Sequence, residues 1–264
     1  MKENRHKMSN DSIITLNEIK MILENYHIGK KPLAKLLGWG ETTIIRYMEG
    51  DIPTNEYSDK LKIIFENPSL YYDTLLKYKD NLTGVAFKKS KKAVLKKIMA
   101  SKINVIAQYI VNKSNADICA SYLQFILYYI QAFSLALKDK ELFEEEYSVN
   151  YNSMPYLKLY ENMKSYGINT LEMSEDDLTL EEKELIDKVY DSFSWYGSKA
   201  LVAMTSYEKT FLKVSRDKEN CKIITKDAIK MYFKEILMQY NIQNIGDITN
   251  YIDKKMMELR NIYN

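Results

Sequence analysis

The sequence contains few of the residues on which disulfides, metal sites and nucleophilic catalysis depend. Of its 264 residues, two are cysteine and two are histidine. Cys119 and Cys221 lie far apart and form no CxxC motif, which argues against a disulfide scaffold or a structural zinc site and fits a reducing cytoplasm. His6 and His27 both lie near the N-terminus. The later part of the chain therefore cannot assemble a Cys-His or Ser-His-Asp catalytic set.

Glycine and proline are also scarce, with eight and four residues. This scarcity favours helices over a turn-rich β architecture, so we expect a mainly α fold. The apolar share of 46% and the charged share of 28% are ordinary for a soluble globular protein, and the length suits two modest domains. The N-terminal stretch MKENRHKMSNDS is polar with no apolar run behind it, so we expect no signal peptide.

Charge of both signs is present, but it is unevenly distributed. The net charge is +2, yet residues 1–101 hold 18 Lys and Arg against 12 Asp and Glu, while residues 102–264 hold 20 against 24. A basic front and an acidic back suit a nucleic-acid module joined to a protein-binding module. One uncharged run, residues 118–137, is long enough to cross a bilayer. Because it contains two glutamines, two serines and three tyrosines, we expect a buried core helix and no membrane span.

Residues 28–50, IGKKPLAKLLGWGETTIIRYMEG, predict a helix-turn-helix. Apolar positions around Leu33 recur at helical spacing, and a second run contains Ile44 and Tyr47. Gly38 lies between the runs, where the turn needs a backbone conformation that a side chain would penalise. Two short helices joined in this way form the DNA-reading unit of repressors.

The segment resembles the lambda-repressor-like family. Nine residues fall on the family pattern in register: Leu33, Ala34, Leu37, Gly38, Thr43, Ile44, Arg46, Tyr47 and Gly50. The resemblance implies that the second helix enters the major groove, with Thr42 and Thr43 suited to base or phosphate contacts and Arg46 to phosphate or guanine. The implied DNA-binding residues are Lys30, Gly40, Glu41, Thr42, Thr43 and Arg46.

Some positions depart from that family. Gly29 and Lys30 stand where Thr-Gln is usual, Gly40 stands where a serine would cap the second helix, and Ile45 is apolar at an outward position. The alternative interpretation is a helical hairpin that kept the fold and lost DNA binding.

Residues 50–78 resemble the part that follows the helix-turn-helix in MqsA-like antitoxin regulators, without the four-cysteine zinc ribbon that often precedes it there. Two helices are expected at 54–65 and 68–78, which places the first domain at 1–82. Residues 87–97 carry six lysines in eleven positions. We interpret residues 83–101 as a basic linker helix; the alternative is an arm that contacts DNA phosphates.

Residues 102–237 resemble the Panacea, or SocA-like, antitoxin domain, and we assign residues 102–264 to this domain. Four motifs match in order, at residues 123–137, 140–143, 180–187 and 224–233. The first contains Gln124, Tyr128, Tyr129 and Gln131. The second precedes an acidic extended segment, and the third opens a helix after Thr179. Two motifs depart, at 152–155 and 204–211, although the second retains Thr205 and Glu208. The two tyrosines and two glutamines are expected to satisfy one another or backbone groups inside the core.

Acidic clusters offer the only candidates for a metal or acid-base site in this second domain. These are residues 144–146 and 175–177, but contiguous carboxylates are typical of solvated loops and lack the spacing of a calcium loop. We therefore expect no catalytic residue, metal or cofactor.

Together the resemblances imply a cytoplasmic antitoxin of a type II toxin-antitoxin system. Its second domain would neutralise a partner toxin by direct binding, and its first domain would repress the operon by binding operator DNA, as a homodimer on paired half-sites. Three alternatives stay open: a regulator whose second domain senses a ligand or protein, a proteolytic adaptor, and a binding protein with a vestigial DNA module. The sequence leaves the toxin-binding surface unassigned.

Overall fold

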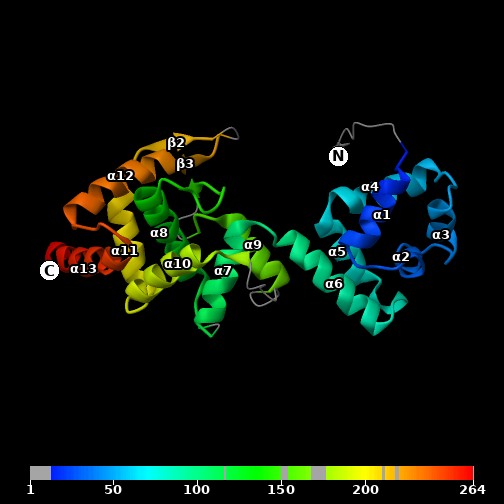
Figure 1. Cartoon of the computed structure of the whole chain (residues 1–264), viewed down its shortest axis with the longest axis horizontal. Coiled ribbons are helices and arrows are strands. Elements are labelled where there is room, and N and C mark those ends of the chain that lie inside the picture. The colour runs from blue at the N-terminus through cyan, green and yellow to red at the C-terminus, as the bar shows by residue number, and fades with distance from the viewer. Residues whose placement is uncertain are drawn as a thin grey trace, which may run out of the picture. The chain divides into compact units, whose positions relative to one another are not determined.

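The computed structural model describes residues 13–115, 117–149, 154–167, 177–209, 212–217 and 220–263. The fold is mainly α, and the chain divides into two compact units, Met1–Ile98 and Met99–Asn264 (Figure 1). In the described part of the chain, the strands form one three-stranded sheet in the second unit. The expected fold class is therefore confirmed.

The first unit contains short helices in close succession. They are α1 (Leu16–Asn25), α2 (Lys30–Leu36), α3 (Thr43–Met48), α4 (Asn55–Glu66), α5 (Pro68–Lys77), the 3-10 helix η1 (Lys79–Asn81) and α6 (Gly84–Ile98). A capping box between Thr15 and Glu18 sets the start of α1. Asn67 caps α5 by accepting from the backbone N–H groups of Ser69 and Leu70, at the boundary that the sequence predicted.

The basic helix belongs to the first unit, whereas the sequence interpretation made it a linker. Ser90, Val94 and Leu95 of α6 are buried, and α6 packs on α5 and α1. The Tyr71 and Ser90 hydroxyl oxygens lie 2.6 Å apart, and the Tyr71 ring stacks on that of Tyr26 with centroids 3.7 Å apart. The sequence pattern showed the lysines, but the apolar side of this helix was too narrow to reveal its packing.

The second unit is built around one buried helix. Its elements are α7 (Lys102–Lys113), α8 (Ala120–Lys138), β1 (Tyr147–Ser148), α9 (Leu157–Tyr166), α10 (Leu180–Phe193), α11 (Ser198–Lys209), β2 (Val214–Arg216), β3 (Lys222–Ile224), α12 (Lys226–Gln239), the 3-10 helix η3 (Ile245–Ile248) and α13 (Thr249–Tyr263). Helices α7, α10, α11 and α12 pack against α8. By length and composition α8 could span a membrane, but 78% of its apolar window is buried inside this unit.

Two features of the second unit were not predicted. An acidic extended segment was expected, but its pairing was not: Tyr147 of β1 lies antiparallel to Ile224 of β3, and β2 pairs with the other edge of β3. Helix α13 was not predicted from the sequence either, although Tyr251, Ile252 and Met256 on one side of this helix are buried. Strands of two or three residues are too short to show alternation, which explains the first omission.

Candidate functional site

Helices α2 and α3 form the predicted helix-turn-helix. Leu33, Ala34 and Ile44 are fully buried where the helices meet. Helix α2 ends in a Schellman motif: the backbone N–H of Trp39 donates to the Ala34 carbonyl at 2.8 Å, and that of Gly38 to the Lys35 carbonyl at 3.1 Å. Gly38 has φ of +74°, so the conformational requirement inferred from the sequence is confirmed.

Five of the six predicted DNA-binding residues lie in α3 or in the turn just before it, and Lys30 begins α2. Lys30, Gly40, Glu41, Thr42 and Arg46 are exposed and Thr43 is half-buried. Helix α3 begins at Thr43, with Thr42 as its N-cap residue, and it has only six residues. Their exposure makes the side chains accessible to a groove, while the short helix limits how many base edges it can reach.

Glu41 joins the start of α3 to the lysines of α2. Its carboxylate lies 2.8 Å from Lys35 Nζ and 3.9 Å from Lys31 Nζ. The hydrogen bond and the charge of Lys35 lower the pKa of Glu41. The pairs bring cationic side chains of α2 beside the N-terminus of α3, where DNA phosphates would compete with Glu41 for them.

Arg46 is held at one edge by an acidic neighbour. Its Nε lies 2.7 Å from Asp51 Oδ2, both side chains are more than half exposed, and the pair raises the pKa of the guanidinium. A guanidinium has five N–H donors. The contact through Nε therefore leaves the terminal nitrogens as donors for phosphate or guanine.

Three aromatic side chains, Trp39, Tyr47 and Tyr57, pack against one another beside this surface. The ring centroids of Trp39 and Tyr57 lie 4.4 Å apart, and those of Tyr47 and Tyr57 lie 6.4 Å apart. Tyr47 is almost fully buried, which raises its pKa. The contacts fix α3 against α4. Trp39 and Tyr57 were not identified from the sequence, because aromatic contacts between separate helices have no spacing signal.

In the second unit, the retained Glu208 meets the tyrosine pair of the first Panacea-like motif. Glu208 is fully buried, and it accepts hydrogen bonds from Tyr128 at 3.2 Å, from Tyr129 at 3.1 Å, and from Tyr251. Burial raises the pKa of Glu208 to about 7, although the three hydroxyl donors lower it. The carboxylate thus links α8, α11 and α13 inside the core. Thr205 donates to the Leu201 carbonyl in its own helix.

The two glutamines of α8 bind backbone groups, as expected. Gln124 exchanges two hydrogen bonds with the backbone of Tyr156, of 2.8 and 3.3 Å. Gln131 donates to the Phe143 carbonyl and accepts from the Leu142 N–H, both at 2.9 Å. These side chains are satisfied, so they do not form an open polar pocket.

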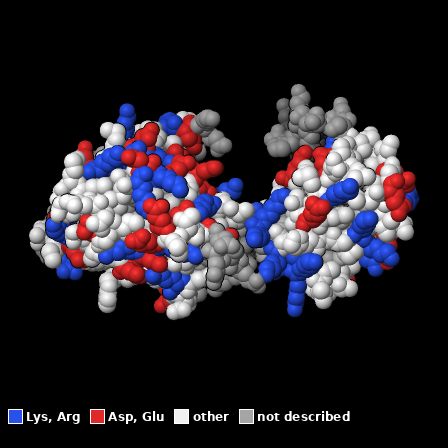
Figure 2. Space-filling model, viewed as in Figure 1, with Lys and Arg blue, Asp and Glu red and all other residues white. Residues whose placement is uncertain are grey.

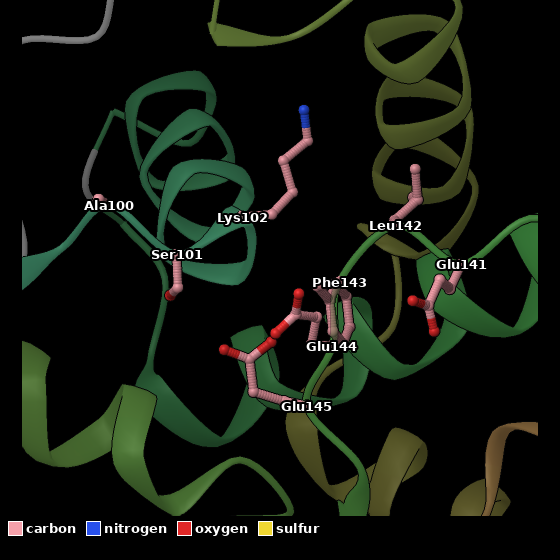
Figure 3. Close-up of a pocket in the computed structure, with 8 residues that line it drawn as sticks. All are labelled: Ala100, Ser101, Lys102, Glu141, Leu142, Phe143, Glu144 and Glu145. Carbon is pink, nitrogen blue, oxygen red and sulfur yellow. The ribbon is translucent and has the colours of Figure 1, made fainter.

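A hollow of about 400 Å³ lies beside the first acidic cluster and is lined in part by Glu141, Glu144 and Glu145. Figure 3 shows the carboxylates of Glu144 and Glu145 next to each other, with the Lys102 amine turned away from them. That amine bonds to Glu182 at 2.9 Å. In the described part of the chain, no three His, Cys, Asp or Glu side chains group in a way that could hold a metal ion.

The remaining members of the acidic clusters differ in their surroundings. Glu146 turns inward, and burial raises its pKa. Glu175 and Asp176 of the second cluster lie outside the described residues.

Trp195 is a surface residue that the sequence interpretation did not single out. It follows α10 and is 90% exposed. Together with Tyr196 it lines one hollow that also includes Asp191 and Asp253, and Tyr196 lines a second hollow with Tyr122. Tryptophan is enriched among the residues that dominate the energy of protein interfaces, which makes Trp195 a candidate for a contact with another protein. Comparisons of the chain with models of known families, with curated proteins and with solved structures return no match.

Proposed function

We propose that this chain is a cytoplasmic antitoxin that binds operator DNA through its first unit and a protein toxin through its second. The observation that carries the proposal is the helix-turn-helix with its outward residues exposed at the start of α3. The toxin-binding part rests on the resemblance of the second unit to Panacea domains.

Each exposed group around α3 has a distinct use in the major groove. Gly40 has no side chain and lets the backbone approach a phosphate, while the Thr42 hydroxyl donates to a base or a phosphate oxygen. Arg46 supplies the bidentate donor that guanine accepts. Lys30, at the N-terminus of α2, adds a positive charge that attracts the phosphate backbone of the DNA. Because half-sites of such motifs are paired, a homodimer is part of the proposal.

The DNA-binding part is tested by footprinting the full chain on the DNA upstream of its own gene, followed by fluorescence anisotropy on the protected site. Arg46→Gln is expected to lower affinity for that site by about tenfold or more and to relax selectivity at one base pair. Lys254→Gln, an exposed lysine of the second unit, is the matched control and leaves affinity unchanged. Equal binding of the site and a scrambled duplex would refute sequence-selective repression.

The core of the second unit supports the Panacea-like interpretation. The tyrosines of the 123–137 motif and Glu208 of the 204–211 motif are 79 and 80 positions apart in the chain and are joined by hydrogen bonds. Residues that match separate motifs of a family are expected to meet if the match reflects a shared fold. Because these hydrogen bonds hold the side chains inside the core, the proposal assigns the toxin contact to other residues.

Trp195 is the residue we assign to the toxin contact. The C-terminal turn of α10 has no basic residue and contains Asp191, and Asp253 accepts from Tyr196 at 3.3 Å. Helix carbonyls and carboxylates favour a cation, and an indole ring stacks on a guanidinium. Asp191 also pairs with Lys113 at 3.1 Å and Lys188 lines the same hollow, so the charge of this surface is mixed. We therefore assign the contact to the indole ring itself, with an arginine side chain of the toxin as its partner.

The test is a growth assay with the reading frame adjacent to this gene, expressed with and without this chain. If the neighbour arrests growth and the chain restores it, Trp195→Ala is expected to weaken the purified complex at least tenfold. Met238→Ala, at a similarly exposed residue of α12, is the control. A harmless neighbour would instead favour a regulator whose second unit senses another molecule. Loss of the partner protein rather than of its activity would favour a proteolytic adaptor.

A further inference from the structure

Helix α6 presents a row of lysines away from the core of the first unit. Lys88, Lys89, Lys92 and Lys96 are exposed and lie within about a third of the helix circumference, opposite the side that is buried. The helix contains no acidic residue. Figure 2 shows Lys and Arg atoms gathered on the surface of the part of the first unit where α6 lies.

The row is held in place by the same unit that carries the helix-turn-helix. The hydroxyls of Ser90 and Tyr71 share a buried hydrogen bond of 2.6 Å, and Val94 is fully buried. Just before α6, Asn81 of η1 donates to the Lys35 carbonyl in α2 at 3.2 Å. The N-terminal end of α6 is thus connected to the helix-turn-helix through a short, hydrogen-bonded segment.

Such a row weakens a helix when it stands alone. Lys88 and Lys92, and Lys92 and Lys96, are four residues apart, and like charges at this spacing repel. Packing against α5 offsets this cost in the folded unit. A polyanion laid along the row would remove the repulsion, and a DNA duplex carries about one negative charge per 1.7 Å of its axis. From Lys88 to Lys96 the helix spans about 12 Å, so several phosphates fall within reach.

We propose that the exposed lysines of α6 bind the phosphate backbone of DNA beside the base pairs that α3 contacts. The inference rests on the proposed DNA binding of the first unit. Phosphate contacts add affinity and salt dependence without sequence information. In this arrangement α3 selects the site, and α6 supplies affinity that a six-residue reading helix does not provide by itself.

The test uses the full chain, the footprinted site as a 30-bp duplex and a scrambled duplex of the same composition. The variant Lys88→Gln, Lys89→Gln, Lys96→Gln is compared with the control Lys158→Gln, Lys199→Gln, Lys254→Gln, which removes three exposed lysines from the second unit. Affinity is measured by fluorescence anisotropy from low to moderate KCl. The α6 variant is expected to bind both duplexes about 10- to 100-fold more weakly, and the slope of log affinity against log salt falls by about 2 to 3.

Three results would overturn the inference. If the α6 variant keeps the affinity and slope of the control while the wild type selects its site, α6 does not contact phosphate and the proposed function survives. If the wild type binds neither duplex at low salt, both proposals fail. If Lys→Arg at the same three positions does not restore the slope, the loss reflects folding and not charge. Melting curves of each variant accompany the measurements.

Discussion

The two units treat their polar motif residues in opposite ways. In the first unit Arg46, which matches the family pattern, and Thr42, which the resemblance implies for DNA contact, lie on the surface. In the second unit the matching polar residues, Gln124, Gln131 and Glu208, are buried and bonded to the protein itself. The difference teaches that polar residues singled out by a motif can lie on the surface in one domain and inside the core in another.

The largest expected effect comes from removing the buried carboxylate. Glu208→Ala would leave three buried tyrosine hydroxyls without their acceptor, so the free energy of unfolding of the second unit should fall by about 3–5 kcal/mol. Chemical denaturation followed by circular dichroism and Trp fluorescence measures it. Glu235→Ala, an exposed carboxylate on α12, is the control. A loss equal to that of the control would show that the hydroxyls find other partners.

The pH dependence of stability sharpens the same comparison. The pKa of Glu208 is about 7 in the folded chain and 4.5 as its ordinary value, so folding favours the protonated acid. The resulting stabilisation is complete below pH 4.5 and is lost as pH rises through 7, on the order of 3 kcal/mol in all. Glu208→Gln, which cannot titrate, is expected to remove this dependence. The Glu208 contribution is absent if Gln and wild type show the same slope between pH 5 and 8.

Replacing one glutamine should have a smaller effect. Gln131→Leu keeps the side-chain size but leaves the Leu142 N–H and the Phe143 carbonyl unpaired, which lowers the free energy of unfolding by about 1–3 kcal/mol. Thermal unfolding of the second unit measures the change. Exposed Gln239→Leu on α12 serves as the comparison. If water replaces the amide without cost, the two variants will melt alike.

The smallest effect is expected at the surface of the first unit. Asp51→Asn removes the charge that holds Arg46 Nε, so the guanidinium becomes free to rotate. Because exposed ion pairs contribute little, stability should be unchanged, while DNA affinity at low salt rises a few-fold. Anisotropy on the footprinted duplex tests this, with Asp59→Asn on α4 as the control. Weaker binding would mean that Asp51 positions Arg46 for DNA.

Several parts of this arrangement could be predicted from the sequence, and local rules explain why. Gly38 was identified because the turn between the two helices requires a positive φ, and the start of α10 was placed after Thr179, where the structure shows a capping box with Glu182. Glu208 was noted as retained, but its three partners come from helices far apart in the chain, so no spacing could indicate them. The packing of α6 and the exposure of Trp195 depend on tertiary contacts in the same way.

The two glutamines of α8 fix the distance between the two places where the following chain is bonded to this helix. They are seven residues apart, close to two helical turns, so both amides point to the same side and bind the chain at Leu142–Phe143 and at Tyr156. One residue inserted between Gln124 and Gln131 would rotate one amide by about 100° and detach one of the two points. Between these two points, Tyr147 of β1 pairs with Ile224 of β3, so the sheet holds this part of the chain as well. Insertions and deletions should therefore be excluded from α8 between the two glutamines.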